Sequence, residues 1–399
     1  MDTKSCQRSV FSSSLVPPPV RCILFLAAAF FLSLAGTADA HEMDRTSFTA
    51  AEVCGYCHAD IYENWKSSFH ARAYADPVFQ KAYRTAFSAI GAKSKQLCLK
   101  CHAPTILATK DAEAKLPITR EGVTCDFCHT IEAVDLKNAA APFKSDVGGQ
   151  KKASMRLLGA HPNPSGSNPA AHQAAYTEWF NKSELCGGCH EMVNANGVKV
   201  GQTYSEWKAS TFATEGIQCQ GCHMTPVEGA PYVASVKAPQ KTTIADHTLL
   251  LNREKLENAV DLKVVSAELN DAGAYVVDIA MVNVKAGHNI PTGSPSRALT
   301  LEVSLEGDGL VRVVQVRSFG KRIVDKKGNW LTTEVDALLK GTKEKYNTSL
   351  KPMESRTVHF VFSNVPAGKL KVTARAFITQ NPVVDSEEHL HVPLGMVEN

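Results

Sequence analysis

Five copies of one pentapeptide pattern, Cys-x-x-Cys-His, are the residues of this sequence with the clearest capacity for chemistry. Chance would produce a single match in roughly one in a hundred chains of this composition, so five matches need a chemical explanation. Apart from Cys6 and Cys22 near the N-terminus, every cysteine belongs to one of the motifs. In chain order the first to the fifth motif contain Cys54, Cys57 and His58; Cys98, Cys101 and His102; Cys125, Cys128 and His129; Cys186, Cys189 and His190; and Cys219, Cys222 and His223.

The spacing within each motif is that of the attachment sequence for c-type haem. Two thiols separated by two residues can bond to the two vinyl groups of one porphyrin, and the next residue can offer its imidazole to the iron. The sequence therefore predicts five covalently attached haem c groups, each with the histidine of its motif as proximal iron ligand. Zinc ribbons need no histidine after each cysteine pair, and a redox Cys-x-x-Cys would normally occur once.

The sixth coordination position of each iron decides whether a haem only passes electrons or also binds a substrate. Nine of the fourteen histidines lie outside the motifs. His41 is expected at the new N-terminus, and three more are expected on the surface, namely His359, His389 and His391. The other five match the haems in number and are the candidate distal ligands: His70, His161, His172, His247 and His288.

His288 differs from the other candidates because it lies in "AGHNIPTGSP", directly after a predicted strand. Gly287, Pro291 and Gly293 favour a tight, rigid loop, which could carry His288 toward a haem. The alternative is a well-formed turn with no ligand role. Met155 and Met192 are fallback ligands, and methionine ligation would raise the potential of its haem.

Residues 1–40 have the features of a cleavable export signal. Basic residues precede an apolar run at 22–36, and Ala38-Asp39-Ala40 follows as a cleavage site. The run is shorter than the about 20 residues of a spanning helix. We therefore predict cleavage after Ala40, no integral membrane anchor in the mature protein, and a periplasmic or secreted, extracellular location. An uncleaved anchor is the alternative.

The charge of the chain limits the classes of partner that we expect it to bind. It has 43 basic and 40 acidic side chains, a net charge of +3. Haem propionates add about two negative charges per haem, partly offset by ferric iron, so the holoprotein is expected to be somewhat acidic. Nucleic acid is therefore not an expected partner. The expected partners are other redox proteins, either quinol-linked or cytochrome donors and acceptors.

The segment that must position the motifs, residues 41–255, has few long apolar stretches. Such a segment could hardly build an ordinary core from side chains, so we expect the porphyrins to form the core, wrapped by short helices and loops. A repeated Tyr-x-x-Trp, at Tyr62/Trp65, Tyr176/Trp179 and Tyr204/Trp207, predicts helices with both rings on one face. These rings could pack on a porphyrin or make an ordinary aromatic contact.

From residue 256 the hydrophobic pattern changes to a period of two. Leu299, Leu301, Val303 and Leu305 alternate with polar residues, and "AYVVDIAMVNV", "TVHFVF" and "LKVTARAFI" are also strand-like. Turn sequences such as "NDAG", "EGDG" and "DKKGN" separate the runs. Six to eight short strands predict an all-β antiparallel sandwich at 256–399, possibly immunoglobulin-like. The predicted organisation is thus a signal peptide at 1–40, a pentahaem cytochrome c domain at 41–255 and this sandwich.

The motif half resembles multihaem c-type cytochromes of the cytochrome c-554 type. The matching stretches are "CGYCHADIYENWKSSFHARA", "GVTCDFCHTI", "SELCGGCHEMVNANGV", "TYSEWKAS" before "GIQCQGCHM", and "GHNIPTG" before the strand-rich tail. The resemblance implies closely stacked haem pairs, bis-His coordination and electron transfer outside the cytoplasm. It also implies distal-ligand roles for His70, His172, His247 and His288. No Cys-x-x-Cys-Lys occurs, unlike in cytochrome c nitrite reductases, and hydroxylamine-oxidising relatives carry more haems.

These observations favour an electron-transfer protein over an enzyme, with no catalytic residue assigned. Mostly bis-His ligation would keep the haem potentials low. The first alternative is a reductase of a small nitrogen or sulfur oxyanion at one five-coordinate haem. The second is self-assembly as the subunit of an extracellular haem filament, in which a neighbour supplies a missing distal histidine.

Overall fold

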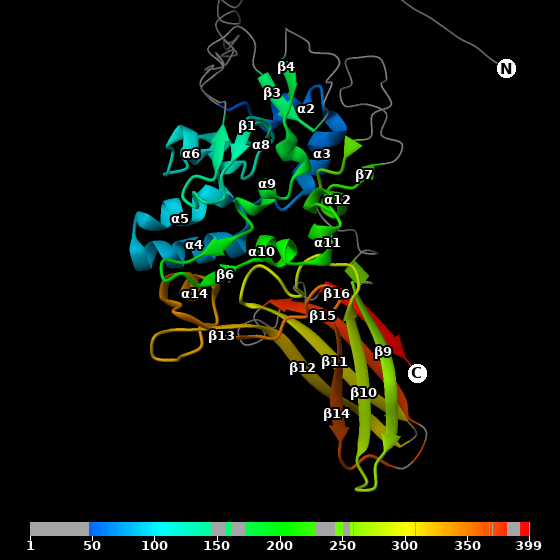
Figure 1. Cartoon of the computed structure of the whole chain (residues 1–399). Coiled ribbons are helices and arrows are strands. Elements are labelled where there is room, and N and C mark those ends of the chain that lie inside the picture. Colours follow the sequence, from blue (N-terminus) through cyan, green and yellow to red (C-terminus); the bar gives the residue numbers. More distant parts are fainter. Residues whose placement is uncertain are drawn as a thin grey trace, which may run out of the picture. The chain divides into compact units, whose positions relative to one another are not determined.

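The computed structural model describes residues 48–145, 156–160, 172–227, 244–249, 256–257, 259–307, 309–366, 368, 370–380 and 392–398. Residues Arg45–Asn399 form one compact unit (Figure 1). Several predictions concern residues outside the described ranges: the signal peptide with its cleavage site after Ala40, His41, Met155, His161, His389 and His391.

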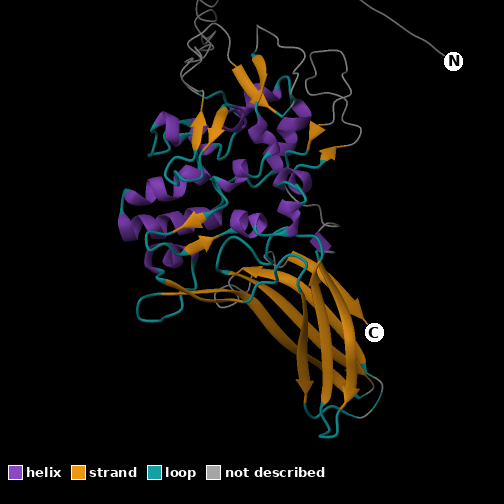
Figure 2. Cartoon of the chain, in the orientation of Figure 1, coloured by secondary structure: helices purple, strands orange, loops and turns teal. Residues whose placement is uncertain are grey.

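The motif region, residues 48–227, consists mainly of short helices, as predicted (Figure 2). The longest begins at Pro77, where the Asp76 carboxylate caps the Phe79 N–H at 2.8 Å, and it ends before Gly91 at φ +58°. No helix in the described ranges is both long and apolar enough to span a bilayer. The helices are α2 (Ala51–Gly55), α3 (Ala59–Ser67), α4 (Pro77–Ile90), α5 (Lys93–His102), α6 (Ile106–Thr109), α7 (Pro117–Arg120), α8 (Cys125–His129), η2 (Glu178–Asn181), α9 (Glu184–Gly187), α10 (Thr203–Lys208), α11 (Thr211–Thr214) and α12 (Cys219–His223).

Short two-stranded ladders connect these helices. Three of the ladders are antiparallel, and the one between β3 and β4 is parallel. The strands are β1 (Ile131–Val134) with β2 (Phe143–Ser145), β3 (Arg156–Gly159) with β4 (Gln173–Tyr176), β5 (Met192–Val193) with β6 (Lys199–Gly201), and β7 (Pro226–Val227) with β8 (Ile244–Ala245).

The strand region, residues 259–398, contains eight strands in its described part, in two antiparallel sheets. The first sheet has the order β14-β10-β9, and the second has the order β13-β12-β11-β15-β16. The predicted turns lie between strands, with Gly273, Gly309 and Gly328 at positive φ. The strands are β9 (Val260–Leu269), β10 (Tyr275–Asn283), β11 (Arg297–Gly307), β12 (Leu310–Val324), β13 (Lys343–Asn347), β14 (Ser355–Phe362), β15 (Lys371–Gln380) and β16 (Val392–Glu398).

The two sheets share one hydrophobic core. Leu299, Leu301, Val303 and Leu305 of β11 are all fully buried, as their spacing predicts. They pack in one cluster with residues of the other sheet, such as Ile279. Twenty buried residues belong to this cluster, whereas the cluster among α7, α8 and β1 contains only four and the cluster around α5 only three. The described motif region therefore has little side-chain core of its own, which agrees with the expectation that porphyrins fill its interior.

A helix that the sequence reading did not anticipate joins the strand region to the motif region. Helix α14 (Glu334–Lys340) follows β12, is capped by the Thr333 hydroxyl, and packs against α4 and β6 (Figure 1). The Asn194 side-chain amide donates to the carbonyl oxygens of Ala337 (3.0 Å) and Gly341 (2.8 Å) at the end of this helix. The two regions are thus joined by buried, directional hydrogen bonds.

One aromatic prediction is wrong. Tyr176 ends strand β4 and Trp179 lies in the 3₁₀ helix η2, so these two residues do not share a helix face. Three-residue spacing puts side chains on one face only when the backbone between them is helical, and here the strand ladder with β3 determines the backbone. The other two pairs do lie on helices, with ring centroids 6.0 Å apart for Tyr62/Trp65 and 5.6 Å for Tyr204/Trp207.

Truncating the shared core should weaken the strand region. Leu301 is fully buried, so Leu301→Ala should lower the free energy of unfolding by about 2–5 kcal/mol through lost burial and the cavity left behind. Denaturation followed by far-ultraviolet circular dichroism measures the change. Val311→Ala is the matched control, because Val311 is 86% exposed, and its effect should stay within about 0.5 kcal/mol. Equal effects of the two substitutions would contradict the proposed core.

Candidate haem sites

Each Cys-x-x-Cys-His motif lies in or beside one helical turn. The second, third and fifth motifs lie within α5, α8 and α12, and the fourth begins in α9. In the first motif, α2 ends at Gly55, and the His58 N–H donates to the Cys54 carbonyl at 2.9 Å. A helical turn places residues three apart on the same face, so both thiols of a motif point the same way. None of the ten cysteines in the described ranges forms a disulfide, and Cys222 alone among them is exposed.

The structure contains one structural unit twice. The first unit comprises the first motif, α3 and the third motif; the second comprises the fourth motif, α10 and the fifth motif. In each unit, a glycine inside the first Cys-x-x-Cys lies against the tyrosine ring. A Cβ added to Gly55 would lie 2.8 Å from the Tyr62 ring, and a Cβ added to Gly187 would lie 2.7 Å from the Tyr204 ring. The repeated Tyr-x-x-Trp therefore orders the attachment segment itself.

The tryptophan of each unit fixes the second motif of that unit. Trp65 Nε1 donates to the Val123 carbonyl at 2.8 Å, and Trp207 Nε1 donates to the Ile217 carbonyl at 2.9 Å. Both carbonyls lie two residues before the first cysteine of the next motif. The unit thus explains why "EGVTC" and "EGIQC" are so similar. The second motif lies in the segment inserted between Trp65 and Val123.

Thiols of different motifs lie close together. Cys54 lies beside Cys125 in the first unit, and Cys186 lies beside Cys219 in the second. Cys101 of the second motif lies beside Cys189 of the fourth. Cys128 of the third motif also lies near Cys186 and Cys189. The five attachment segments therefore form one connected cluster.

Three of the proximal histidines face a histidine from elsewhere in the chain. The ring centroids are 6.1 Å apart for His58 and His172, with an interplanar angle of 30°. They are 6.3 Å apart for His70 and His190, at 52°. For His223 and His288 the separation is 6.4 Å, at 21°.

These separations fit an iron atom between the two rings. A ligating imidazole nitrogen lies about 2.0 Å from its metal and about 1.1 Å from its ring centre, so two imidazoles on opposite sides of one iron have centres about 6 Å apart. Ordinary ring pairs have centroids about 4.5–7 Å apart, so the separation supports haem binding only together with the motif histidine that each of the three pairs contains. Distal ligation by the partner histidines stays a prediction.

Backbone carbonyls orient several of these imidazoles. His247 Nδ1 contacts the Ala245 carbonyl at 2.7 Å, His288 Nδ1 the Asn289 carbonyl at 3.0 Å, and His172 Nδ1 the Gln173 carbonyl at 3.2 Å. A carbonyl can only accept, so Nδ1 must carry the proton and Nε2 keeps its lone pair. Metal-ligating histidines typically donate the N–H of their other ring nitrogen to a backbone carbonyl in this way.

Burial keeps the imidazoles in the form that binds a metal. It lowers the pKa of His190 to about 4, because the charged form loses its hydration. Burial likewise lowers the pKa of the other imidazoles in this set, those of His70, His102, His247 and His288. Neutral imidazole is the form that ligates iron.

His102 of the second motif has different surroundings. Phe79 stacks on its ring at 3.8 Å, and His102 Nδ1 donates to the Ala73 carbonyl at 2.9 Å. No histidine in the described ranges faces it as in the three pairs.

The other predicted ligands do not belong to the three histidine pairs. His247 interacts electrostatically with His58, and Phe180 stacks on His129 at 4.9 Å. Met192 of β5 packs against the hydrophobic cluster of Val198 and Val200, which does not favour it as a fallback ligand. His359 lies on the exposed face of β14 and pairs with Asp278, as a surface histidine would.

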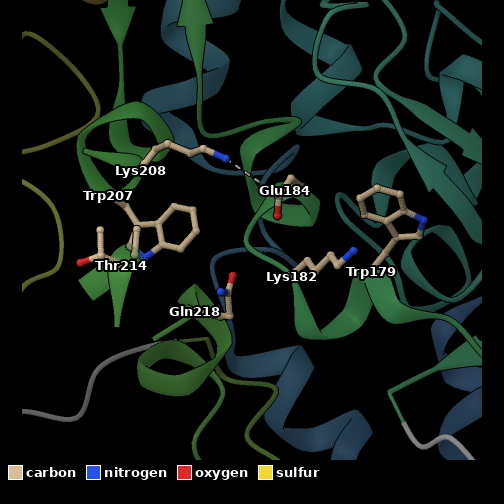
Figure 3. A pocket seen from close by; sticks show the side chains of 8 residues that line it. Trp179, Lys182, Glu184, Trp207, Lys208, Thr214 and Gln218 are labelled. Carbon is tan, nitrogen blue, oxygen red and sulfur yellow. Dashed lines mark ion pairs between the residues drawn. The ribbon is translucent and has the colours of Figure 1, made fainter. Parts of the chain in front are cut away.

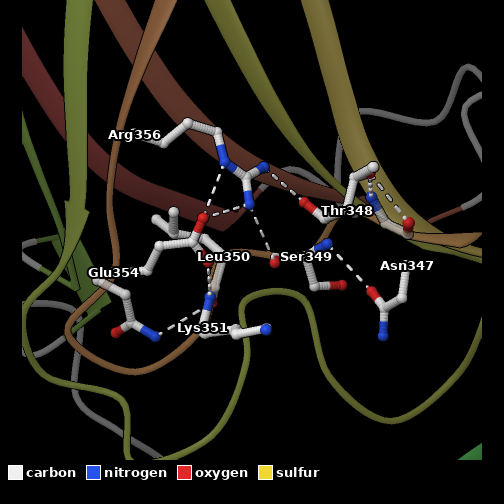
Figure 4. Close-up of polar contacts among 9 residues, drawn as sticks. Asn347, Thr348, Ser349, Leu350, Lys351, Glu354 and Arg356 are labelled. Atoms are coloured by element: carbon white, nitrogen blue, oxygen red, sulfur yellow. Dashed lines mark hydrogen bonds and ion pairs between the residues drawn. The ribbon is translucent and has the colours of Figure 1, made fainter.

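The loop that carries His288 is anchored in the strand region. Ile290 and Leu350 exchange backbone hydrogen bonds of 2.9 and 2.8 Å, and Asn283 Nδ2 donates to the His288 carbonyl at 3.0 Å. The connection between β13 and β14, which contains Leu350, is held in turn by Arg356, which donates to the Thr348 carbonyl at 2.8 Å (Figure 4). Well-satisfied backbone groups of this kind make the loop rigid.

A cavity of about 460 Å³ opens between the fourth and fifth motifs (Figure 3). Trp179 and Trp207 line it from two sides, and Lys208 pairs with Glu184 at 3.7 Å. At its base the Gln218 side chain accepts hydrogen bonds from the Ser183 N–H (2.9 Å) and hydroxyl (2.8 Å), which joins the starts of the two motifs. Trp179 thus contributes to a site between motifs although it is not on a helix face with Tyr176.

Two residues that contact the loop of His288 were not predicted from the sequence. Glu206 and Phe212 belong to the second unit and contact the loop of His288. Aligning "YENWKSSFH" with "YSEWKASTF" would have marked them, because Glu206 corresponds to Asn64 and Phe212 to His70.

Comparisons with known proteins agree with this geometry. The cytochrome c554 and c-prime family matches residues 53–130, which contain the first three motifs. The penta-heme cytochrome c552 from Thermochromatium tepidum has 21% sequence identity and a TM-score of 0.68, over 89% of this chain and 100% of that one. This likeness shows a shared fold.

Two further comparisons add nothing to it. AvmM, which catalyses macrocyclization in alchivemycin A biosynthesis, gives 14% identity and a TM-score of 0.18 over 36% of this chain and 87% of that one, too low to carry an argument. No curated protein sequence matches the chain. The family match over residues 53–130 and the shared fold both make the chain similar to multihaem c-type cytochromes.

Proposed function

We propose that this protein is an exported pentahaem cytochrome that carries electrons through a chain of closely spaced, mostly bis-His, low-potential haems. The observation that carries the proposal is the common separation of the three histidine pairs, 6.1 to 6.4 Å. The haem supplies an iron that gains and loses one electron. The chain supplies the thiols that attach the porphyrin and the imidazoles on both sides.

Paired imidazoles suit electron transfer. When both axial positions are occupied by protein ligands, no position is left for a substrate, and only the charge of the iron changes. Histidine pairs also keep the potential lower than methionine ligation would, and Met192 packs away among apolar residues.

The thiol contacts support a continuous path for electrons. Each attaching cysteine bonds to the porphyrin edge, so thiols in contact bring the edges of two haems close together. The contacts join the first motif to the third, the second to the fourth and the fourth to the fifth. Cys128 of the third motif lies near Cys186 of the fourth. The fourth motif thus forms the junction of the proposed path.

The location and partners follow from the same proposal. Covalent haem attachment takes place outside the cytoplasmic membrane, which agrees with the predicted export signal in residues 1–40. Redox proteins would donate to one end of the haem chain and accept from another. The two sheets that share a core would form the sandwich, and this sandwich would supply His288 to the motif region.

One observation favours the enzyme alternative at the second motif. His102 faces no histidine in the described ranges and has the Phe79 ring stacked on it. A haem held there with an open sixth position could bind a small nitrogen or sulfur oxyanion.

Haem content and spin state test the proposal. Purified mature protein should contain five haems per polypeptide, one for each motif, by mass spectrometry and pyridine haemochrome assay. Electron paramagnetic resonance of the oxidised protein should show mainly low-spin ferric signals. A high-spin signal equivalent to one haem would support the enzyme alternative, and colourless exported protein would overturn both.

Removing one distal candidate should open one iron. His70 faces His190, so His70→Ala should convert one haem per polypeptide from low to high spin and leave the haem count unchanged. His359→Ala is the control, because that histidine lies on the strand region and pairs with Asp278. An unchanged spectrum for His70→Ala would remove His70 from the ligands.

A partly buried attachment cysteine should matter more for stability than an exposed one. Cys128 is partly buried and Cys222 is exposed, although each should form one thioether. Cys128→Ser should therefore lower the melting temperature of the motif region more than Cys222→Ser, by about 2–4 °C for each kcal/mol of extra destabilisation. Calorimetry of the two variants, with mass spectrometry of the attached haem, measures this. A normal melting temperature for Cys128→Ser would contradict the porphyrin core.

A further inference from the structure

The loop that carries His288 is held from the motif region by one carboxylate. Glu206 Oε2 accepts a hydrogen bond from the Thr292 hydroxyl at 2.6 Å and another from the Asn289 backbone N–H at 3.2 Å. The two donors lie one and four residues after His288, and the strand region fixes the loop between them at Ile290. The position of His288 is thus tied to the position of Glu206.

Helix α10, which bears Glu206, is itself fixed to the fourth motif. The Tyr204 N–H donates to the His190 carbonyl at 3.2 Å, and the Ser205 N–H donates to the Glu191 carboxylate at 3.0 Å. The Thr203 hydroxyl also contacts the Thr292 hydroxyl at 2.9 Å. One short helix therefore contacts both the backbone of a proximal histidine and the loop of a distal candidate from the other region.

The comparison of the two units shows why the second needs this contact. In the first unit the residue two positions after Ser68 is His70, which faces His190. The corresponding residue of the second unit is Phe212, which has no ligand group. Phe212 instead packs against Gly287, where a Cβ would lie only 3.1 Å from its ring. The second unit thus lacks a distal histidine at this position and contacts the loop that brings one.

The environment of Glu206 suits a fixed carboxylate. Its side chain is largely buried, and burial raises its pKa, while the Thr292 hydroxyl and the charge of Lys321 act in the opposite direction. Lys321 is buried as well, and its ammonium donates to the Lys199 carbonyl at 3.1 Å. Hydrogen bonds to a charged acceptor are stronger than those between neutral groups, so this contact can hold a loop.

We propose that Glu206 is a positioning residue that keeps His288 opposite His223 and so keeps the sixth position of the fifth-motif haem closed. The proposal rests on the proposed function, because it takes His288 to be an iron ligand. Without the carboxylate, the segment from Asn289 to Thr292 loses its only two bonds to the Glu206 side chain, and His288 can leave the iron more often. An external ligand can then bind in its place.

Carbon monoxide binding to the reduced, full-length holoprotein tests this proposal. His288→Ala should add one CO-binding haem per polypeptide over the wild type. Glu206→Ala should raise the apparent CO affinity of that haem about tenfold over the wild type, because losing hydrogen bonds to a charged acceptor shifts the open fraction by about that factor. Glu206→Gln keeps an acceptor oxygen and should shift the affinity much less.

Two further variants keep the test decisive. Asn194→Ala removes another contact between the two regions, the one to α14, and should leave CO binding as in the wild type. If Glu206→Ala fails to fold, Thr292→Val removes one of the two donors and should give an intermediate shift. Wild-type CO binding in Glu206→Ala, or the same gain in Asn194→Ala, would overturn the positioning role. No gain in His288→Ala would overturn the ligation of His288 itself, and the positioning role with it.

Discussion

The coordination of iron by two imidazoles on opposite sides is the constraint on which the rest of the proposed arrangement depends. It fixes the separation of two rings and their direction, and each ring comes from a different part of the chain. His58 faces His172, His190 faces His70, and His223 faces His288. Because these partners are far apart in sequence, the motif region can hold its shape with few buried apolar side chains, and each iron would act as a cross-link between distant segments.

The repeated unit uses the same two side-chain interactions to hold two different pairs of motifs. A tyrosine packs on the glycine of one motif while the tryptophan three residues later binds a carbonyl before the next motif. The same two interactions recur although Trp65 and Val123 are 58 residues apart, whereas Trp207 and Ile217 are only 10 apart. The contact between the two motifs is therefore set by these side chains and not by the length of the connection.

Much of the fold and of the site could be predicted because the relevant patterns are local. Spacing within a motif determines attachment, and the alternation at Leu299 to Leu305 determines a buried strand face. Long-range partners could be proposed but not matched, since which histidine faces which depends on the whole chain path. Tyr176 and Trp179 show the same limit, because the ladder between β3 and β4 overrides the helical interpretation. The role of Glu206 depends on a loop more than eighty residues away.

The second motif lies wholly within the insertion between Trp65 and Val123. Neither the tyrosine packing nor the tryptophan hydrogen bond of the first unit uses any residue of that insertion. The same insertion nevertheless contains His70, which faces His190 of the second unit. Its chain path is therefore constrained at both ends by the first unit and in between by the second, so a replacement segment would have to present a histidine at the same place.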